Sequence, residues 1–284
     1  MKTNREIERI ITGQHTSDGA GVKLTRILGH NTQELTDPFL MLDFFGSDNP
    51  DDFMAGFPSH PHRGIETVTY MLDGKVEHSD SMGNRGVISK GDIQWMTAGS
   101  GIIHEEMPKY EQGKMHGFQL WVNLPSHSKM TTPRYQDIPA ASIPVVELEN
   151  KVKVKVLAGT FQGVKGPVKD IIAEPEYFDI KMPENTELVV PADPEHTVFA
   201  YLFEGSATFD ETGKQTLRAS EGALFGQGDQ VSVRTAGSKA RFILIAGKPI
   251  RESIAWYGPV VMNTEAEIEL AFKELRNNTF IKHG

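Results

Sequence analysis

The chain has 284 residues, of which 38% are hydrophobic, and its formal net charge at pH 7 is −9. It contains no cysteine, which excludes disulfides and thiol chemistry and leaves a bound metal as the available redox group. The acidic balance comes without a basic tract or basic helix, which argues against direct nucleic-acid binding, and no apolar run approaches the length of a membrane span.

Short β-strands separated by glycine and proline turns are predicted along most of the chain. They are rich in β-branched and aromatic residues, and several alternate apolar with polar positions. In chain order, the segments that we interpret as strands or parts of strands are 6–12, 22–28, 37–46, 66–74, 91–96, 118–125, 151–156, 178–182 and 242–247. Two stretches lack this pattern: residues 76–86 read as a polar turn, and residues 126–144 read as a linker between domains.

One α-helix is predicted near the C-terminus. Thr264 followed by Glu267 has the spacing of a capping box, and apolar residues then recur at helical spacing as far as Leu275. We expect this short helix to pack against the sheet structure and to carry no chemistry.

A repeated pattern indicates two copies of one β unit. Tyr70 and Gly91 in the first half recur as Tyr201 and Gly222 in the second half, each at an offset of 131 residues. Many short strands with glycine turns, in two copies, predict an all-β chain of two tandem jelly-roll barrels followed by a short C-terminal helix.

Two pairs of polar residues are the strongest chemical signal in the sequence. Side chains alternate faces along a strand, so His60 and His62 point the same way, and so do His104 and Glu106. If their strands are neighbours in a curled sheet, three imidazoles and a carboxylate converge, which suits a divalent transition metal. A lone histidine is more often an ordinary core or surface residue, but the two pairs with a β-rich connection are far more specific.

The second half of the chain does not repeat these ligand types. The 131-residue offset maps the four positions, in order, to Pro191, Asp193, Thr235 and Gly237. We therefore expect one divalent metal ion per chain, in the N-terminal barrel.

At these residues the sequence resembles the cupin superfamily and, within it, closely resembles the pirin family. The segments that carry the resemblance are 37–43, 60–68, 94–99, 101–104, 119–124 and 257–259. The resemblance covers nearly the whole chain and is most specific in the N-terminal half. It implies a bicupin, in which residues 1–130 form a metal-binding cupin barrel and residues 145–284 form a second cupin barrel that ends in the helix.

The resemblance also implies the ligands. By similarity, His60, His62, His104 and Glu106 are the four metal ligands and Fe(II) is the expected ion, although Mn, Co, Ni or Zn also suits this ligand set. General cupins place their carboxylate shortly after the second histidine, which is Glu66 here. The context around His104 resembles pirins, so we place the ligand at Glu106 and expect Glu66 to orient a ligating imidazole from outside the coordination sphere.

For function, the resemblance implies a metal-dependent oxidoreductase similar to quercetin 2,3-dioxygenase, which opens a flavonol ring with O₂ and releases carbon monoxide. The metal would lower the pKa of the flavonol enol, and Glu106 is the candidate base for its proton. Phe53, Phe57, Trp95 and Met96 are candidates for a flat aromatic pocket, although a core role is equally expected for Trp95 and Met96.

Other pirins are described as nuclear cofactors of transcription factors, so an alternative stays open. In that alternative the protein is a non-enzymatic, iron-binding redox sensor that acts through a protein partner. In either case we expect a monomer, cytoplasmic or, in a eukaryote, also nuclear, that binds neither nucleic acid nor membranes directly. Turnover of quercetin in air separates the two.

Overall fold

The computed structural model describes residues 2–110, 113–210 and 215–283. They form two compact units, each built mainly of antiparallel strands. The unit called here the first barrel contains Gln14–Gln33 and the described parts of Phe39–Ala140 and Ile250–Gly284. The second barrel contains the described parts of Met1–Gly13, Glu34–Pro38 and Ala141–Pro249. No helix among the described residues has the length and apolar character needed to cross a membrane.

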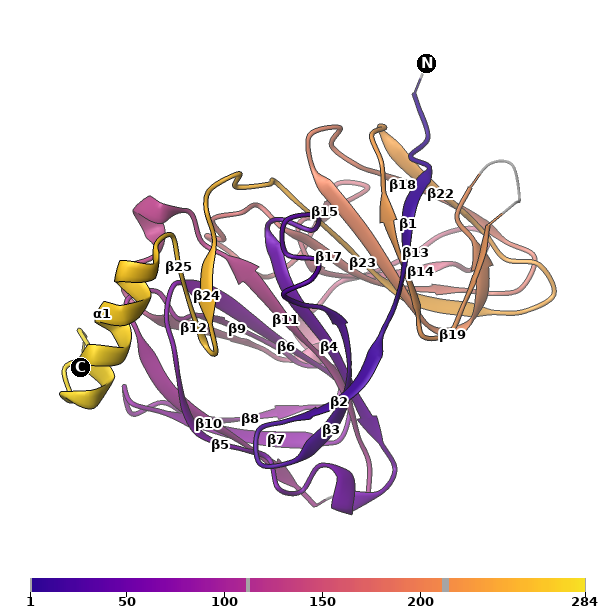
Figure 1. The fold of residues 1–284 in the computed structure, drawn as a ribbon. Helices are drawn as coiled ribbons and strands as arrows, with labels where there is room; N and C mark the ends of the chain where they lie inside the picture. Colours follow the sequence, from indigo (N-terminus) through magenta and orange to yellow (C-terminus); the bar gives the residue numbers. More distant parts are fainter. Residues whose placement is uncertain (1, 111–112, 211–214, 284) are drawn as a thin grey trace. The chain divides into compact units, whose positions relative to one another are not determined.

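The first barrel consists of a seven-stranded sheet and a four-stranded sheet (Figure 1). In spatial order the larger sheet contains β12 (Arg134–Ile138), β9 (Ile93–Thr97), β6 (Ile65–Asp73), β11 (Met115–Asn123), β4 (Phe39–Ser47), β3 (Val22–Leu28) and β2 (Gln14–Asp18). The smaller sheet contains β5 (Phe57–His62), β10 (Ile102–Lys109), β7 (Lys75–Asp80) and β8 (Arg85–Ser89). Phe118, Leu120 and Val122 of β11 are fully buried, as their alternation predicted.

Two stretches that we predicted to be irregular contain strands. Residues 76–86 lie in the β7–β8 hairpin, where Val76 and His78 alternate into the barrel and are buried. Residues 126–144 contain β12, which pairs with β9 at the edge of the larger sheet. The prediction of a turn at 76–86 was wrong because these strands are polar and the hairpin buries a histidine. The prediction of a linker at 126–144 missed β12, because an edge strand needs little apolar surface, but the boundary between the two units does fall in this range, between Ala140 and Ala141.

The second barrel contains a ten-stranded sheet and a short ribbon. Along its main path lie β1 (Ile7–Thr12), β21 (Glu221–Phe225), β19 (Thr197–Thr208), β23 (Ala240–Gly247), β17 (Glu176–Met182), β14 (Lys153–Ala158) and β13 (Val145–Glu147). Off this path lie β18 (Glu187–Pro191), β20 (Thr216–Arg218) and β22 (Gln230–Arg234), and the ribbon is β15 (Thr160–Phe161) with β16 (Val164–Lys165). Apolar side chains from these strands form one continuous core.

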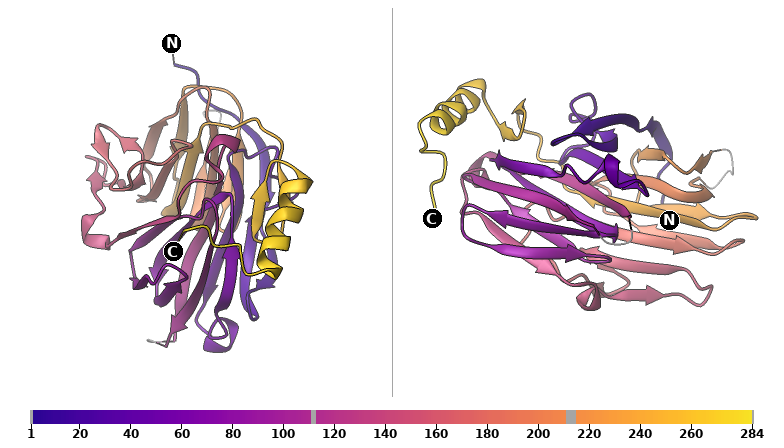
Figure 2. Two further views of the ribbon diagram at one scale, coloured as in Figure 1. Left: turned by 90° about the vertical axis from the view of Figure 1, so that its left-hand side faces the viewer. Right: turned by 90° about the horizontal axis from the view of Figure 1, so that it is seen from below.

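The two ends of the chain correct our domain assignment. Helix α1 (Glu265–Arg276) has the predicted capping box between Thr264 and Glu267. It packs with β24 (Ala255–Tyr257) and β25 (Val260–Met262) in the first barrel, and Figure 2 shows it beside the strands of that barrel. Strand β1 instead pairs with β21 of the second barrel. The predicted domains 1–130 and 145–284 therefore assign each terminal segment to the wrong barrel. The sequence pattern identifies a strand or helix but does not show which other strands it packs against.

A buried lysine helps to hold the C-terminal segment in the first barrel. The side chain of Lys129, which follows the 3₁₀ turn Ser126–Ser128, is fully buried. Its Nζ donates to Gly64 O at 2.9 Å, Asn123 Oδ1 at 2.7 Å and Val261 O at 3.0 Å. These hydrogen bonds join the turn after His62 to β25, so residues near both ends of the first barrel are tied at one point.

We expect Lys129→Met to lower the free energy of unfolding by about 3 kcal/mol, because three buried carbonyl oxygens each lose the hydrogen bond from Nζ. Urea denaturation of the purified protein measures this change. Lys90→Met, at a lysine whose side chain is 69% exposed, is the control and should change stability by less than about 1 kcal/mol. Equal effects of the two substitutions would contradict the proposed role of Lys129.

Candidate metal centre

Three imidazoles meet where β5 and β10 pair. His60 is the register partner of His104 in this antiparallel pair, and His62 lies on the same face of β5 as His60. The nearest ligand-type nitrogens of the three rings all lie within 4.8 Å of one another. Among the described residues, this is the one group of three or more ligand-type side chains that lies so close together. The structure thus brings the three predicted histidines together. His60 and His62 share a face because side chains alternate along β5, as predicted, and the pairing of β5 with β10 adds His104.

The protonation of the imidazoles suits a cation. Burial lowers the pKa of His62 and His104 well below the ordinary value, and neighbouring imidazoles lower it further. His60 Nδ1 lies 2.9 Å from Pro58 O and His62 Nδ1 lies 3.3 Å from Pro259 O. Because carbonyl oxygens accept, both rings carry their proton on Nδ1 when neutral.

This tautomer leaves two lone pairs facing each other. His60 Nε2 and His62 Nε2 are 3.0 Å apart, and neither can donate when Nδ1 holds the proton. Two nitrogens bound at right angles to one ion, each about 2.1 Å away, are about 3.0 Å apart. In addition, both ring nitrogens of His104 are buried without a hydrogen-bond partner among the described residues. The three imidazoles therefore fit a single divalent metal ion.

Glu106 lies beside this group on β10, but its carboxylate is not in the 4.8 Å cluster. Burial raises the pKa of Glu106, whereas His60 and Thr69 lower it. Thr69 Oγ1 lies 3.1 Å from Glu106 Oε1 and 2.7 Å from Gln119 Oε1. One hydroxyl proton cannot serve both oxygens, so an ionised Glu106 requires the Gln119 amide to be turned with Nε2 toward Thr69. Glu106, Thr69 and Gln119 then form one connected chain.

Glu66 lies elsewhere. It belongs to β6, where Thr69, three residues along, lines the same cavity as Glu106; Glu66 therefore faces the opposite side of the sheet. Thr97 Oγ1 donates to Glu66 Oε1 at 2.7 Å. Burial raises the pKa of Glu66, and hydrogen bonding from Thr97 lowers it. Among the described residues no hydrogen bond joins Glu66 to an imidazole, so the orienting partners in this structure are the backbone carbonyls of Pro58 and Pro259.

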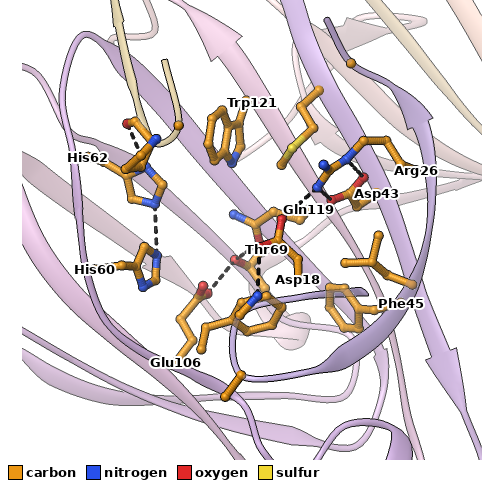
Figure 3. A pocket seen from close by; sticks show the side chains of 18 of the residues that line it. Asp18, Arg26, Asp43, Phe45, His60, His62, Thr69, Glu106, Gln119 and Trp121 are labelled. Carbon is orange, nitrogen blue, oxygen red and sulfur yellow. Dashed lines mark hydrogen bonds and ion pairs between the residues drawn. The ribbon is translucent and has the colours of Figure 1, made fainter. Parts of the chain in front are cut away.

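A cavity of about 600 Å³ opens beside the histidines (Figure 3). His60, His62 and Glu106 line one side. Trp121 and Trp256 line the wall next to them, with ring centroids 5.8 Å apart. Trp121 stands edge-on to His62, at a centroid distance of 5.1 Å. The cavity therefore presents a metal-type ligand set and two indole rings to whatever enters it.

Of the four residues predicted to form an aromatic pocket, one lines this cavity. Phe57 does so, at the start of β5. Phe53 is buried and does not line the cavity, which corrects its assignment. Trp95 and Met96 of β9 are completely buried and do not line the cavity, so the core interpretation holds for both.

The opposite side of the cavity carries charged residues that the sequence analysis missed. Arg26 donates from Nε and Nη2 to the two carboxylate oxygens of Asp43, at 2.9 and 2.7 Å, and from Nη2 to Asp18 at 2.8 Å. Burial raises the pKa of Asp43 to about 6, and the hydrogen bonds from Arg26 oppose that rise. The available signal was an aspartate inside the apolar run at 37–46. Trp256 was missed because its segment was assigned to the second barrel.

In the second barrel, the strands that correspond to the histidine-bearing β5 and β10 carry apolar side chains. There β18 pairs with β22, and β22 also pairs with β19, as β5 pairs with β10 and β10 with β7. The inward residues of β18 and β22 belong to the core: Leu188, Val190, Val231 and Val233. The simple 131-residue offset pointed to other positions, because loop lengths differ between the two units.

Comparisons with family models and with known proteins all point to the pirin family. The chain matches the family model described as Pirin over residues 21–122 and that of the Pirin C-terminal cupin domain over residues 177–281. A pirin-like protein of Caulobacter vibrioides is 45% identical over 277 residues, which cover 97% of this chain and 99% of that protein.

Solved structures agree with the two-barrel fold. The quercetin 2,3-dioxygenase of Acinetobacter baumannii is 33% identical with a TM-score of 0.90, covering 98% of this chain and 99% of that one. The bacterial pirin YhhW of Escherichia coli, solved in complex with nickel(II), is 20% identical with a TM-score of 0.63, covering 85% of this chain and 99% of that one.

Proposed function

The chain belongs to the pirin family, and on that premise we propose that it is a metal-dependent dioxygenase that opens a flavonol ring with O₂ and releases carbon monoxide. The observation that carries the proposal is the pair of facing Nε2 lone pairs of His60 and His62, 3.0 Å apart, at the wall of a cavity with indole faces. The likeness to the Acinetobacter baumannii quercetin 2,3-dioxygenase supports the choice of substrate class.

His60, His62 and His104 would hold the ion, with Glu106 as the fourth ligand and Fe(II) as the proposed metal. When bound, the ion lowers the pKa of the flavonol hydroxyl and supplies the redox centre for the reaction with O₂. The second barrel offers Val190 and Val231 at the corresponding strands, so the proposal includes one metal site per chain.

The protein's own residues have three tasks in this reaction. Glu106 accepts the enol proton, and the Thr69–Gln119 chain holds its carboxylate in place. Trp121 and Trp256 hold the flat ring system beside the histidines and keep water away from it. The reaction balances without another reductant, because both atoms of O₂ enter the ring-opened ester and one ring carbon leaves as carbon monoxide.

Metal content tests the stoichiometry. We expect protein reconstituted with Fe(II) without oxygen and freed of excess ion to contain one metal per chain, because the matching strands of the second barrel direct valines inward. Elemental analysis against protein concentration measures the ratio. A ratio near two would contradict the assignment of the second barrel as metal-free.

Oxygen consumption tests the function itself. The Fe(II)-loaded protein should consume O₂ when quercetin is added and release one carbon monoxide for each O₂ consumed. The metal-free protein serves as the control and should do neither. If the loaded protein binds quercetin but consumes no O₂, the dioxygenase proposal fails and the redox-sensor alternative gains support.

A further inference from the structure

A charged cluster lies across the cavity from the histidines. Asp18, Arg26 and Asp43 belong to β2, β3 and β4, which are consecutive neighbours in the larger sheet. In Figure 3 they lie on one side of the cavity, His60 and His62 lie on the other, and Gln119 and Trp121 lie between them. The proposed mechanism uses none of the three charged residues.

We infer that the cluster of Asp18, Arg26 and Asp43 recognises ring hydroxyls of the ligand and thereby makes the cavity selective for polyhydroxylated flavonols over unsubstituted ones. This inference rests on the proposed function, since it takes a flavonol as the ligand. It adds specificity-determining residues at the end of the cavity remote from the histidines.

The geometry suits recognition because the guanidinium is held in place before a ligand arrives. Arg26 Nε and Nη2 form a bidentate pair with the buried carboxylate of Asp43, and Nη2 also reaches Asp18. Among the described residues no hydrogen bond engages Arg26 Nη1, so its two N–H groups are available to an oxygen in the cavity. A fixed donor loses little side-chain entropy when it binds a ligand.

The chemistry suits phenols in particular. A phenolic hydroxyl both accepts and donates, so it can accept from Arg26 Nη1 and donate to the carboxylate of Asp18. A second anion is disfavoured here, because Arg26 already faces two carboxylates. The indole rings of Trp121 and Trp256 line the same cavity and can pack against the flat ring of the same ligand. The two sides of the cavity thus match a flat molecule with a metal-binding enol at one end and hydroxyls at the other.

Ligand binding without oxygen tests the inference separately from turnover. Titration of the Fe(II)-loaded protein under anaerobic conditions with quercetin and with 3-hydroxyflavone, followed by tryptophan fluorescence quenching, gives Kd for each. The two ligands share the enol and ketone, but 3-hydroxyflavone lacks all the other hydroxyls. We expect Arg26→Lys to raise the Kd of quercetin about tenfold and that of 3-hydroxyflavone less than about twofold.

The controls separate recognition from fold stability. Arg26→Lys keeps a positive charge near buried Asp43, and Asp18→Asn changes a side chain that is 53% exposed and should also weaken quercetin selectively. Arg241→Lys is the matched control, since Arg241 makes the same bidentate pair with buried Asp179 in the second barrel. It should leave both Kd values unchanged.

The possible results distinguish the two proposals. Equal weakening of both flavonols by Arg26→Lys, or no weakening of either, would overturn the inference even if the wild-type protein turns quercetin over. Selective weakening of quercetin binding would support the inference even if no O₂ is consumed in air, in which case the dioxygenase proposal alone would fail.

Discussion

His104→Ala is expected to weaken metal binding by about 10³-fold and to abolish flavonol-dependent O₂ consumption while the protein stays folded. The imidazole of His104 is buried, and both of its nitrogens lack a hydrogen-bond partner among the described residues. Its removal takes away one of three converging nitrogens. The loss of metal affinity should exceed the 10- to 100-fold that is typical of changes outside the coordination sphere, so about 10³-fold is expected.

The fold should survive because its apolar core does not depend on the ion. Leu40, Ile65 and Trp121 belong to one buried cluster of the first barrel, and Phe45 and Met71 belong to another. A zinc finger, by contrast, has too small a core to fold without metal. Metal analysis and denaturant unfolding measure the two properties, with His116→Ala as the control at a histidine on β11 outside the cluster. Insoluble or non-cooperatively unfolding His104→Ala protein would show that the ion is structural.

Strand alternation was the part of the fold and of the site that could be predicted from the sequence. It is a local property, so β3 appears over the predicted residues 22–28, and Phe118 and Leu120 lie together on a buried face of β11. That face is opposite to the one from which Gln119 lines the cavity. The same alternation placed His60 and His62 on one face, and the pairing of β5 with β10 brought His104 to them. Only the assumption that these strands are neighbours went beyond local pattern.

What could not be predicted depends on where the chain turns. Counted along a single continuous strand, Glu66 would share the face of His62, since the two lie four residues apart. However, β5 ends at His62 and β6 begins at Ile65, and between them Gly64 has a positive φ of 78°. A turn resets the alternation of faces, so counting residues through it fails. A Cβ at Gly64 would lie 1.9 Å from Val261 O, a contact with the C-terminal segment that no local pattern reveals.

Long-range pairing and polar burial account for the other misses. Arg26 and Asp43 are register partners on neighbouring strands, yet in the sequence they are an ordinary arginine and an aspartate in an apolar run. Trp256 reaches the cavity from a segment that follows the whole second barrel. In both cases the residue type can be read from the sequence, but the residues that surround it in the folded protein cannot.

Substitution of Glu106 and of Glu66 distinguishes most clearly between the two candidates for the fourth metal ligand. Glu106→Gln keeps the shape of the side chain but removes its charge, whereas Glu66→Gln makes the same change on the face of β6 opposite to Thr69. We expect Glu106→Gln to weaken metal binding and to lower flavonol-dependent O₂ consumption by about 10²- to 10⁴-fold, as the loss of a general base does. The carboxylate is buried beside His60, which lowers its pKa against the effect of burial.

Glu66→Gln is expected to keep the metal, with a change in affinity of less than about tenfold, because its carboxyl oxygen bonds to Thr97 and not to an imidazole. Its main effect should be on stability, a loss of about 1–2 kcal/mol from a buried hydrogen bond that no longer involves an acid. Anaerobic competition with a chelator measures the metal affinity, and urea denaturation measures the stability. If Glu66→Gln loses the metal and Glu106→Gln retains it, the fourth ligand is Glu66, and the turn at Gly64 places that residue differently from the structure described above.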